Sequence, residues 1–285
     1  MHIIQKEVIK GRMGLRCKQT RIIMANEIAV WNKVLSTALA MPGVKVDRKS
    51  FLEKAFNVHC PPEKLCSLIE TCPQMVVDKT NINKVAKSII GSHLKTVTTL
   101  SAVSGLPGGW TMAATIPADI AQYYYHVLVV SQKLAYVYGL PDLLDDEGNL
   151  SDEGTDLLTV FVGVMSGVSA ANQGLKKLSQ AFAKQVAHRL PQYALTKSII
   201  YRVSKQVAKW LGIRLTKDTF AKGVSKVIPV VGAVTSGALT YVTFNQETKR
   251  LQKALKEDMD LYCNAYRNAE SRMSESNFYT EYTEV

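Results

Sequence analysis

The sequence predicts an all-α fold, a single multi-helix bundle whose central helices are rich in glycine and pack closely. Apolar residues recur at helical spacing through most of the 285 residues, and no convincing run of alternating strand pattern is present. Hydrophobic residues make up 47% of the chain, which is enough to fill a sizeable core. Charged residues make up 21%, so the composition leans apolar without being that of a membrane protein.

The first 23 residues are expected to lie outside the fold. They carry six basic residues against Glu7 alone, and they contain no apolar stretch that would make a secretory signal. Because Met24 opens a helical pattern, we interpret residues 1–23 as disordered or as the product of an early start codon, with a mitochondrial-type targeting peptide as the alternative. We expect one domain over residues 24–270, followed by a polar, disordered tail at 271–285.

Three helices are predicted in the first part of this domain. Residues 48–56 form the first, with Asp47 as its N-cap. Residues 62–71 form the second, because proline suits the first helical turn, where its missing N–H would have no partner. The third is the clearest: Asp78, Thr80 or Asn81 can cap its start, and its apolar stripe consists of Ile82, Val85, Ala86, Ile89, Ile90, Leu94 and Val97.

A glycine-rich turn at residues 105–109 leads to a long helix that starts after Pro117. Seven residues, or about 10 Å of helix, separate Asp119 from His126, which excludes a catalytic dyad of these two. The polar face can nevertheless serve as a hydrolytic site, and the alternative is a structural role as a cap and satisfied polar surface. The candidate catalytic residues on this face are Asp119, Gln122, Tyr123 and His126.

Every charged residue from Asp142 to Asp156 is acidic, which predicts a loop whose last residues cap the next helix. Three segments then stand out because they carry no charge. They are either buried core helices or segments in contact with lipid, and they comprise residues 96–118, 157–175 and 227–246. In the second of them a helical face of small residues allows a neighbouring backbone to approach closely, and it consists of Gly163, Gly167 and Ala171.

Residues 176–226 are the most basic part of the chain, with twelve lysines and arginines against the single acid Asp218. Within them a basic amphipathic helix is predicted, whose apolar stripe consists of Ile199, Ile200, Val203, Val207 and Trp210. The expected partner is an anionic membrane surface, which attracts basic side chains while apolar ones enter the interface. The candidate lipid contacts are Lys197, Arg202, Lys205, Lys209 and Trp210.

The five cysteines are odd in number and irregularly spaced, which argues against a disulfide framework and for a reducing compartment. A helix over residues 62–71 would separate Cys60 from Cys72 by roughly 18 Å, too far for one zinc ion. We therefore predict no metal site and no cofactor. Beyond Glu247 the pattern indicates a mixed-charge helix with Leu251, Leu255, Met259 and Tyr262 on one side.

Two stretches together resemble the EcsC-like protein family. They are GLPGGWTMAATIPADIAQYYYHVLVVSQKLAYVYGLPDL, at residues 105–143, and SKVIPVVGAVTSGALTYVTF, at residues 225–244. The resemblance covers most of residues 82–255. It implies an all-helical bacterial protein with no settled activity, in a family named for a member encoded beside an ABC exporter. The matching motif positions are Gly105, Gly108, Gly109, Pro117, Asp119, Gln132, Tyr138, Gly139, Pro229, Gly232 and Gly237.

These patterns favour a cytoplasmic protein that is peripheral to the inner membrane, and the resemblance adds a role as an accessory to an ABC-type transporter. Membrane-spanning helices, a soluble protein-interaction domain and a hydrolase are the alternatives. Nucleic-acid binding is not expected, because no motif that reads bases accompanies the basic stretch. No reaction is assigned, since neither an activated nucleophile nor a metal set is visible.

Overall fold

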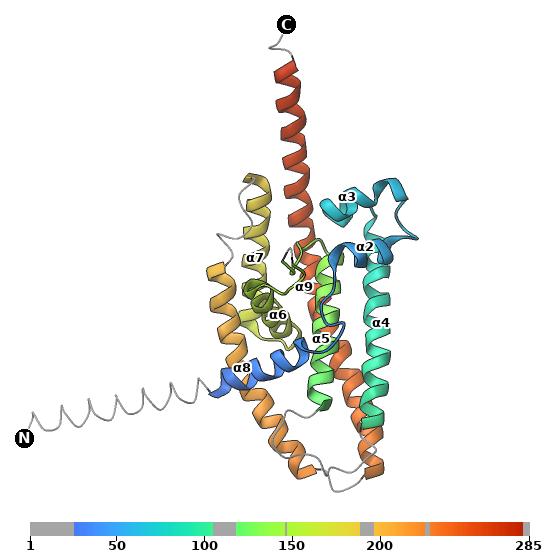
Figure 1. Ribbon diagram of the computed structural model, residues 1–285, viewed down its shortest axis with the longest axis vertical. Coiled ribbons are helices and arrows are strands. Elements are labelled where there is room, and N and C mark those ends of the chain that lie inside the picture. Colours follow the sequence, from blue (N-terminus) through green and yellow to red (C-terminus); the bar gives the residue numbers. More distant parts are fainter. Residues whose placement is uncertain (1–25, 105–117, 146, 189–196, 226–228, 282–285) are drawn as a thin grey trace, which may run out of the picture.

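The computed structural model describes residues 26–104, 118–145, 147–188, 197–225 and 229–281 (Figure 1). Over these residues the chain is a bundle of α-helices with short 3-10 turns, and its only strand-like feature is an isolated bridge between Leu144 and Leu150. The predicted all-α class is therefore confirmed. Residues 1–25, including the expected N-terminal extension, lie outside the described residues.

A helix over residues 26–39 opens the described chain, and α2 (Arg48–Phe56) follows it. Asp47 caps α2 as predicted, because its side chain accepts a hydrogen bond of 2.7 Å from the backbone N–H of Ser50. The predicted helix at residues 62–71 is instead divided into η1 (Pro62–Lys64) and α3 (Leu65–Glu70). The chain then passes through η2 (Pro73–Met75).

The antiparallel helices α4 (Lys79–Ser104) and α5 (Ala118–Val137) lie side by side (Figure 1). Of the three capping candidates for α4, Asp78 acts as the cap, since it accepts from the backbone N–H groups of Thr80 and Asn81. The predicted apolar stripe of α4 is largely buried and packs against α5 and α9; its buried members are Ile82, Val85, Ala86, Ile90, Leu94 and Val97.

The charge-free segment 157–175 is not one helix. α6 (Asp152–Met165) is followed by its C-cap Ser166, and α7 (Ser169–His188) starts three residues after that cap. Gly167 forms the turn with φ of +79°, a conformation that glycine adopts without strain, so the predicted face of small residues is broken there. Gly163 and Ala171 still meet, because the turn folds α7 back against α6. As the acidic loop predicts, Ser151 caps α6 and carboxylates occupy its first turn.

The last two helices are α8 (Lys197–Ser225) and α9 (Pro229–Glu281). The charge-free segment 227–246 and the predicted mixed-charge helix beyond Glu247 are parts of the one continuous helix α9. Contrary to the expected disordered tail, α9 also runs on through residues 271–281. Once the packed part of a helix has formed, each added residue extends it at little further cost, and this favours continuation into a polar segment.

The core lies where α5 and α6 meet α9 and the helix of residues 26–39. Trp31 of that first helix is fully buried and donates a hydrogen bond of 3.2 Å from its indole nitrogen to the hydroxyl of Thr159 in α6. Its ring also packs edge-on against Tyr124 of α5. α9 contacts α4, α5, α6 and α7, so it is the element that most of the bundle shares.

The cysteine count argued against a disulfide framework, but the structure contains one disulfide bond. Cys72, just before η2, is bonded to Cys263 in α9, across 191 residues of sequence. The two cysteines lie in segments that show no spacing pattern in the sequence, so only the fold reveals the pair. Cys60 is buried and Cys66 exposed, and neither is bonded to another cysteine.

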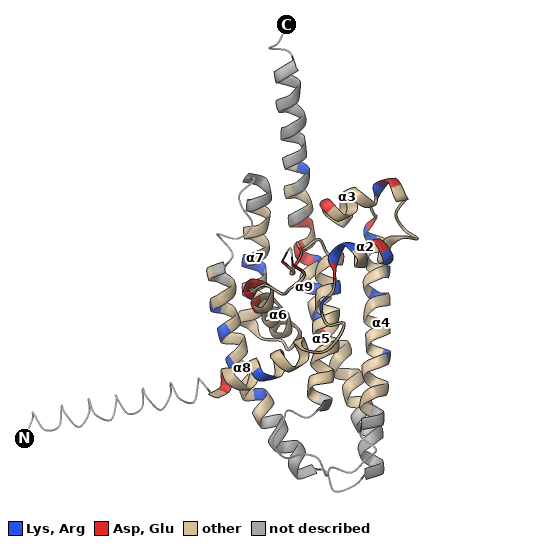
Figure 2. Ribbon diagram, in the orientation of Figure 1, with Lys and Arg blue, Asp and Glu red and all other residues tan. Residues whose placement is uncertain are grey.

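The second and third charge-free segments differ in their surroundings. In the second, the part of α6 from Leu157 to Met165 is buried. Near the start of α9, by contrast, Leu239 is 65% exposed, and Tyr241 and Val242 are each about half exposed. In Figure 2, the lower parts of α4, α5 and α9 that are not drawn grey show few charged residues. None of the described helices has the combination of length and apolar character that a membrane span requires.

Candidate functional site

The outer face of α8 is defined here as Tyr201, Arg202, Lys205, Lys209 and Trp210. All of these except Tyr201 are lipid-contact candidates from the sequence. Tyr201, Arg202, Lys205 and Trp210 are exposed, and Lys209 is half-buried. Two cations lie over the aromatic rings of this face: Lys205 Nζ is 4.9 Å from the ring centre of Tyr201, and the Arg214 guanidinium is 5.4 Å from that of Trp210. The side chain of Lys197, the remaining lipid-contact candidate, lies outside the described residues.

The opposite side of α8 corrects the prediction that its apolar stripe enters lipid. Val207 is fully buried and lies against Gly163 of α6, while Val203 lies against Gly174 of α7. Ile200 is also buried. These side chains hold α8 to the bundle: Val207 and Ile200 are buried, and Val203 is partly buried. Trp210 does not belong to the buried stripe, and it remains at the surface.

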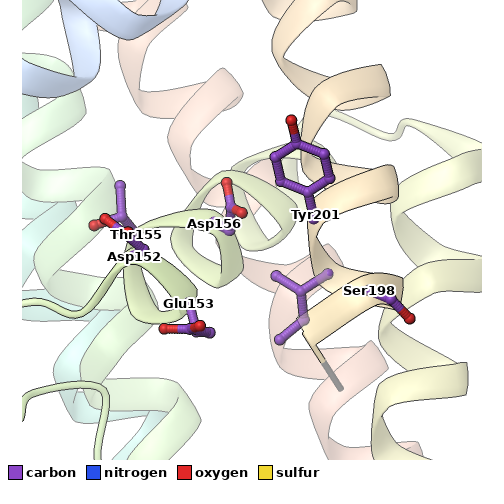
Figure 3. Close-up of a pocket in the computed structure, with 7 residues that line it drawn as sticks. Asp152, Glu153, Thr155, Asp156, Ser198 and Tyr201 are labelled. Atoms are coloured by element: carbon purple, nitrogen blue, oxygen red, sulfur yellow. The ribbon is translucent and has the colours of Figure 1, made fainter. Parts of the chain in front are cut away.

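A cavity of about 720 Å³ opens between the first turns of α6 and α8 (Figure 3). α6 contributes acidic side chains and α8 contributes Ser198, Ile200 and Tyr201. Figure 3 shows Asp156 in the gap between the two helices, on the side toward Tyr201. The cavity therefore adjoins the outer face of α8 through Tyr201, and its other lining residues are Asp152, Glu153 and Thr155.

The acids of this cavity have a structural reason to be there. Asp152 and Glu153 occupy the first turn of α6, where the positive end of the helix dipole favours negative charge. Burial raises the pKa of the Asp156 carboxyl, while a hydrogen bond from Ser204 and the charge of Lys205 partly offset that rise. The acidic group therefore borders the basic outer face of α8 and reduces its positive potential at one end.

The catalytic candidates of α5 whose side chains the structure describes, Gln122, Tyr123 and His126, do not converge on one position. Tyr123 donates a hydrogen bond of 2.6 Å from its hydroxyl to Glu247 of α9, whereas His126 contacts His93 of α4. Gln122 is half-buried on the same helix, and the side chain of Asp119 lies outside the described residues. Tyr123 and His126 thus engage different neighbouring helices, and neither serves as a base for the other.

Glu247 is a buried carboxyl group that the sequence reading did not single out. Burial raises its pKa, and the hydrogen bond from Tyr123 and the charges of Arg214 and Arg250 partly offset the rise. Burial also raises the pKa of Tyr123, followed by the charge of Glu247. Tyr123 therefore keeps its proton and acts as the donor. The pair forms a structural hydrogen bond between α5 and α9.

His126 belongs to a polar cluster with His93 and Lys133. The Nδ1 atoms of the two histidines lie 3.2 Å apart, and Lys133 Nζ lies 3.1 Å from Nε2 of His93. Both His93 and Glu247 lie within apolar stripes. His93 lies between Ile90 and Val97 on α4, and Glu247 lies between Phe244 and Leu251 on α9. A polar residue at a stripe position is the signal that could have identified both.

The motif positions that the structure describes occupy structural places in the helices. Gln132 and Tyr138 are fully buried and hydrogen-bonded to other elements, and Gly139 ends α5 with φ of +90°. Pro229 is the first residue of α9, and Gly232 and Gly237 lie in its first turns. Asp119 lies in the first turn of α5, and its side chain is outside the described residues. The remaining positions, Gly105, Gly108, Gly109 and Pro117, lie wholly outside them.

Within the described part of the chain, no three or more histidine, cysteine, aspartate or glutamate side chains are grouped closely enough to hold an ion. Cys72, one of the cysteines considered for zinc, is bonded to Cys263.

These sites define an all-α bundle with a basic and aromatic outer helix face, an adjoining acidic cavity and two buried polar contacts on α5. Comparison of the chain with protein-family models, with curated proteins and with solved structures gave no significant match.

Proposed function

We propose that the chain is a peripheral membrane protein that binds an anionic lipid surface through the outer face of α8. The observation that carries the proposal is the exposure of Arg202 and Lys205 beside Tyr201 and Trp210 on one helix. Each basic residue near an anionic surface contributes about 1 kcal/mol of attraction. Tyrosine and tryptophan favour the boundary between headgroups and acyl chains, because each has an apolar ring and a polar atom.

Attachment at the surface is the mode that the packing of α8 favours. Because Val203 and Val207 are held against α7 and α6, the helix can present its basic face while it remains part of the bundle. Binding then depends on electrostatic attraction, supplemented by two exposed aromatic rings. Such attraction is screened by salt over a Debye length of about 10 Å at 0.1 M ionic strength.

A role beside an ABC-type transporter at the inner, cytoplasmic membrane face extends this proposal. It rests on the resemblance of residues 105–143 and 225–244 to the EcsC-like family. A protein partner would bind elsewhere on the surface than the lipid, and the exposed apolar side chains of α9 are available for it.

The alternative of a hydrolase at the polar face of α5 receives less support. Its two best-described candidates, Tyr123 and His126, are engaged with Glu247 and His93 on separate helices. A hydrolytic site needs a nucleophile, a base and donors that converge on one substrate position. A soluble interaction domain remains the main competitor of the membrane proposal, and vesicle binding separates the two.

Vesicle flotation of the full chain tests the proposal. We expect binding to phosphatidylcholine vesicles that contain phosphatidylglycerol, weaker binding at high salt, and no binding to phosphatidylcholine alone. Replacing Arg202, Lys205 and Lys209 by glutamine should weaken binding at low salt by about 3 kcal/mol, on the order of a hundredfold. The matched control replaces Lys84, Lys87 and Lys95, three exposed lysines of α4, by glutamine and removes the same net charge.

The control variant should bind much as the unmodified chain does. An equal loss in both variants would show a diffuse charge effect, and failure to float under any condition would overturn the membrane proposal.

The acidic cavity offers a test in which binding should increase. Asp152→Asn removes an exposed negative charge beside the outer face of α8. This substitution should strengthen binding to the anionic vesicles.

A further inference from the structure

The contact between α4 and α5 contains three basic side chains in a row. His93 of α4 lies between His126 and Lys133, which are two turns apart on α5. His93 Nδ1 is 3.2 Å from His126 Nδ1, and His93 Nε2 is 3.1 Å from Lys133 Nζ. Both distances are those of hydrogen bonds, and together they connect the two helices through one imidazole ring.

With Lys133 in its ammonium form, the donors and acceptors along this row can be arranged in only one way. The Lys133 ammonium has donors only, so His93 Nε2 must accept from it. A neutral His93 then carries its proton on Nδ1 and donates it to His126 Nδ1, which must accept. It follows that both imidazoles are neutral, with His93 in the Nδ1–H form and His126 in the Nε2–H form.

A proton added to either histidine breaks this order. If His93 gains a proton at Nε2, an N–H group points at the ammonium of Lys133 and two positive charges face each other. If His126 gains a proton at Nδ1, two N–H groups meet at the 3.2 Å contact unless His93 moves its proton to Nε2, toward Lys133. Every protonated arrangement therefore loses at least one hydrogen bond and adds repulsion.

We propose that this row of three side chains makes the α4–α5 contact an acid-sensitive joint, which holds while both histidines are neutral and loosens when either takes up a proton. The inference goes beyond membrane binding and does not depend on it. The joint regulates how firmly α4 and α5 are held together at His93 and His126.

The surroundings supply no negative charge that would stabilise a protonated histidine. From α5, the charges that act on His93 are Lys133 and His126, and Lys133 also acts on His126; no carboxylate of the described residues contributes at either ring. The other neighbours are aromatic rings: Tyr125 of α5 packs edge-on against His126, and Phe51 of α2 lies 6.0 Å from Lys133 Nζ.

The pKa shifts have the direction that the geometry requires. Burial, followed by the charges of Lys133 and His126, lowers the pKa of His93 from 6.5 to about 3, and burial and Lys133 lower that of His126. The unfolded chain, with histidine near 6.5, therefore binds more protons than the folded one below that pH. Stability should be fully present above pH 6.5 and decline as the pH falls from 6.5 toward 3.

Histidine-ring NMR of the full chain is the first test, because it needs no variant. Ring nitrogen and carbon shifts distinguish the two neutral tautomers. We expect His93 in the Nδ1–H form and His126 in the Nε2–H form near neutral pH, with His93 still neutral at about pH 5. His93 in the Nε2–H form, or titrating near 6.5 as an ordinary histidine does, would overturn the proposal.

Hydrogen exchange tests the joint itself. The closed joint keeps His93 neutral at about pH 5, but in the transiently opened joint the solvated histidines, with pKa near 6.5, take up protons and favour opening. After correction for intrinsic rates, amides around His93 and His126 should therefore exchange faster at about pH 5 than at about pH 7.5. His93→Phe removes the row and fills its place with an apolar ring, so this acid-induced increase should disappear. His59→Gln, outside the row, serves as the control and should keep it. An unchanged pH response in His93→Phe would assign the acid sensitivity to other groups and refute the joint.

Discussion

Gln132 has a role inside the fold that its place in a sequence motif does not reveal. Its side-chain amide donates to the carbonyl oxygens of Val44 and Leu128, at 2.8 and 3.1 Å, and its oxygen accepts from the N–H of Val46 at 3.2 Å. The side chain is fully buried. One residue of α5 therefore binds the connection that leads from the first helix to α2, and it satisfies two backbone groups that have no helical partner.

Substitution of Gln132 by leucine should lower the free energy of unfolding by roughly 2–4 kcal/mol. The substitution keeps the size of the side chain but leaves the carbonyl of Val44 and the N–H of Val46 buried without their partner. Urea unfolding monitored by circular dichroism measures the change. Gln122→Leu, a half-buried position on the same helix, is the control and should cost much less. Equal effects of the two substitutions would contradict the role of Gln132 in binding the backbone of Val44 and Val46.

At the scale of helices, close packing around α6, α7 and α8 depends on two glycines. A methyl group on Gly163 would lie 2.6 Å from Val207 and 2.8 Å from Ala171, and one on Gly174 would lie 2.6 Å from Val203. These distances are shorter than any normal carbon–carbon contact. The absence of side chains at these positions lets α8 approach α6 and α7, so that Val207 is fully buried and Val203 partly buried.

Gly163→Ala should destabilise the protein by about 1–3 kcal/mol, because the added methyl group overpacks the junction of α6 with α7 and α8. Gly91 of α4 provides a matched control, since nothing lies within 4 Å of the methyl group it would gain. Gly91→Ala should stabilise by about 0.5–1 kcal/mol through helix propensity. The two midpoints of thermal unfolding should therefore shift in opposite directions, and a common direction would refute the packing argument.

The helices also show which features could be predicted from sequence. The N-cap Asp47, the stripe of α4 and the start of α5 after Pro117 follow local rules of capping and periodicity, and the structure bears them out. The break between α6 and α7 was missed, because no proline marks it and Gly167 fits a helical face until its positive φ is known. The inward direction of Val203 and Val207 depends on where α6 and α7 lie, which periodicity does not specify.

The candidate sites were harder to predict than the elements. The sequence located the outer face of α8 and the polar residues of α5, but it did not identify the partners Glu247 and His93, which lie more than thirty residues away along the chain. The cavity beside Asp156 combines the first turns of two helices that are separated in sequence. Such pairings arise from tertiary packing alone.

For the whole molecule, the bond between Cys72 and Cys263 ties the region of α3 and η2 to α9. Because it closes a loop of 191 residues, loss of this bond should cost about 5 kcal/mol in a chain-entropy treatment. Urea unfolding with and without reductant measures that difference. Cys66→Ser, at an exposed free thiol, should leave stability nearly unchanged. A non-reducing digest must contain the cross-linked peptides of Cys72 and Cys263; their absence would contradict the pairing.

The position of α9 has a consequence for how the protein unfolds. α4, α5, α6 and α7 all pack against this one helix, while α8 packs against α6, α7 and the helix of residues 26–39, where Gly212 lies against the backbone of Glu27. Removing α9 would therefore expose buried surface on four helices at once, and no pair of them retains its full set of neighbours without it. α9 thus sets the size of the cooperative unit, so these helices should melt together in a single transition.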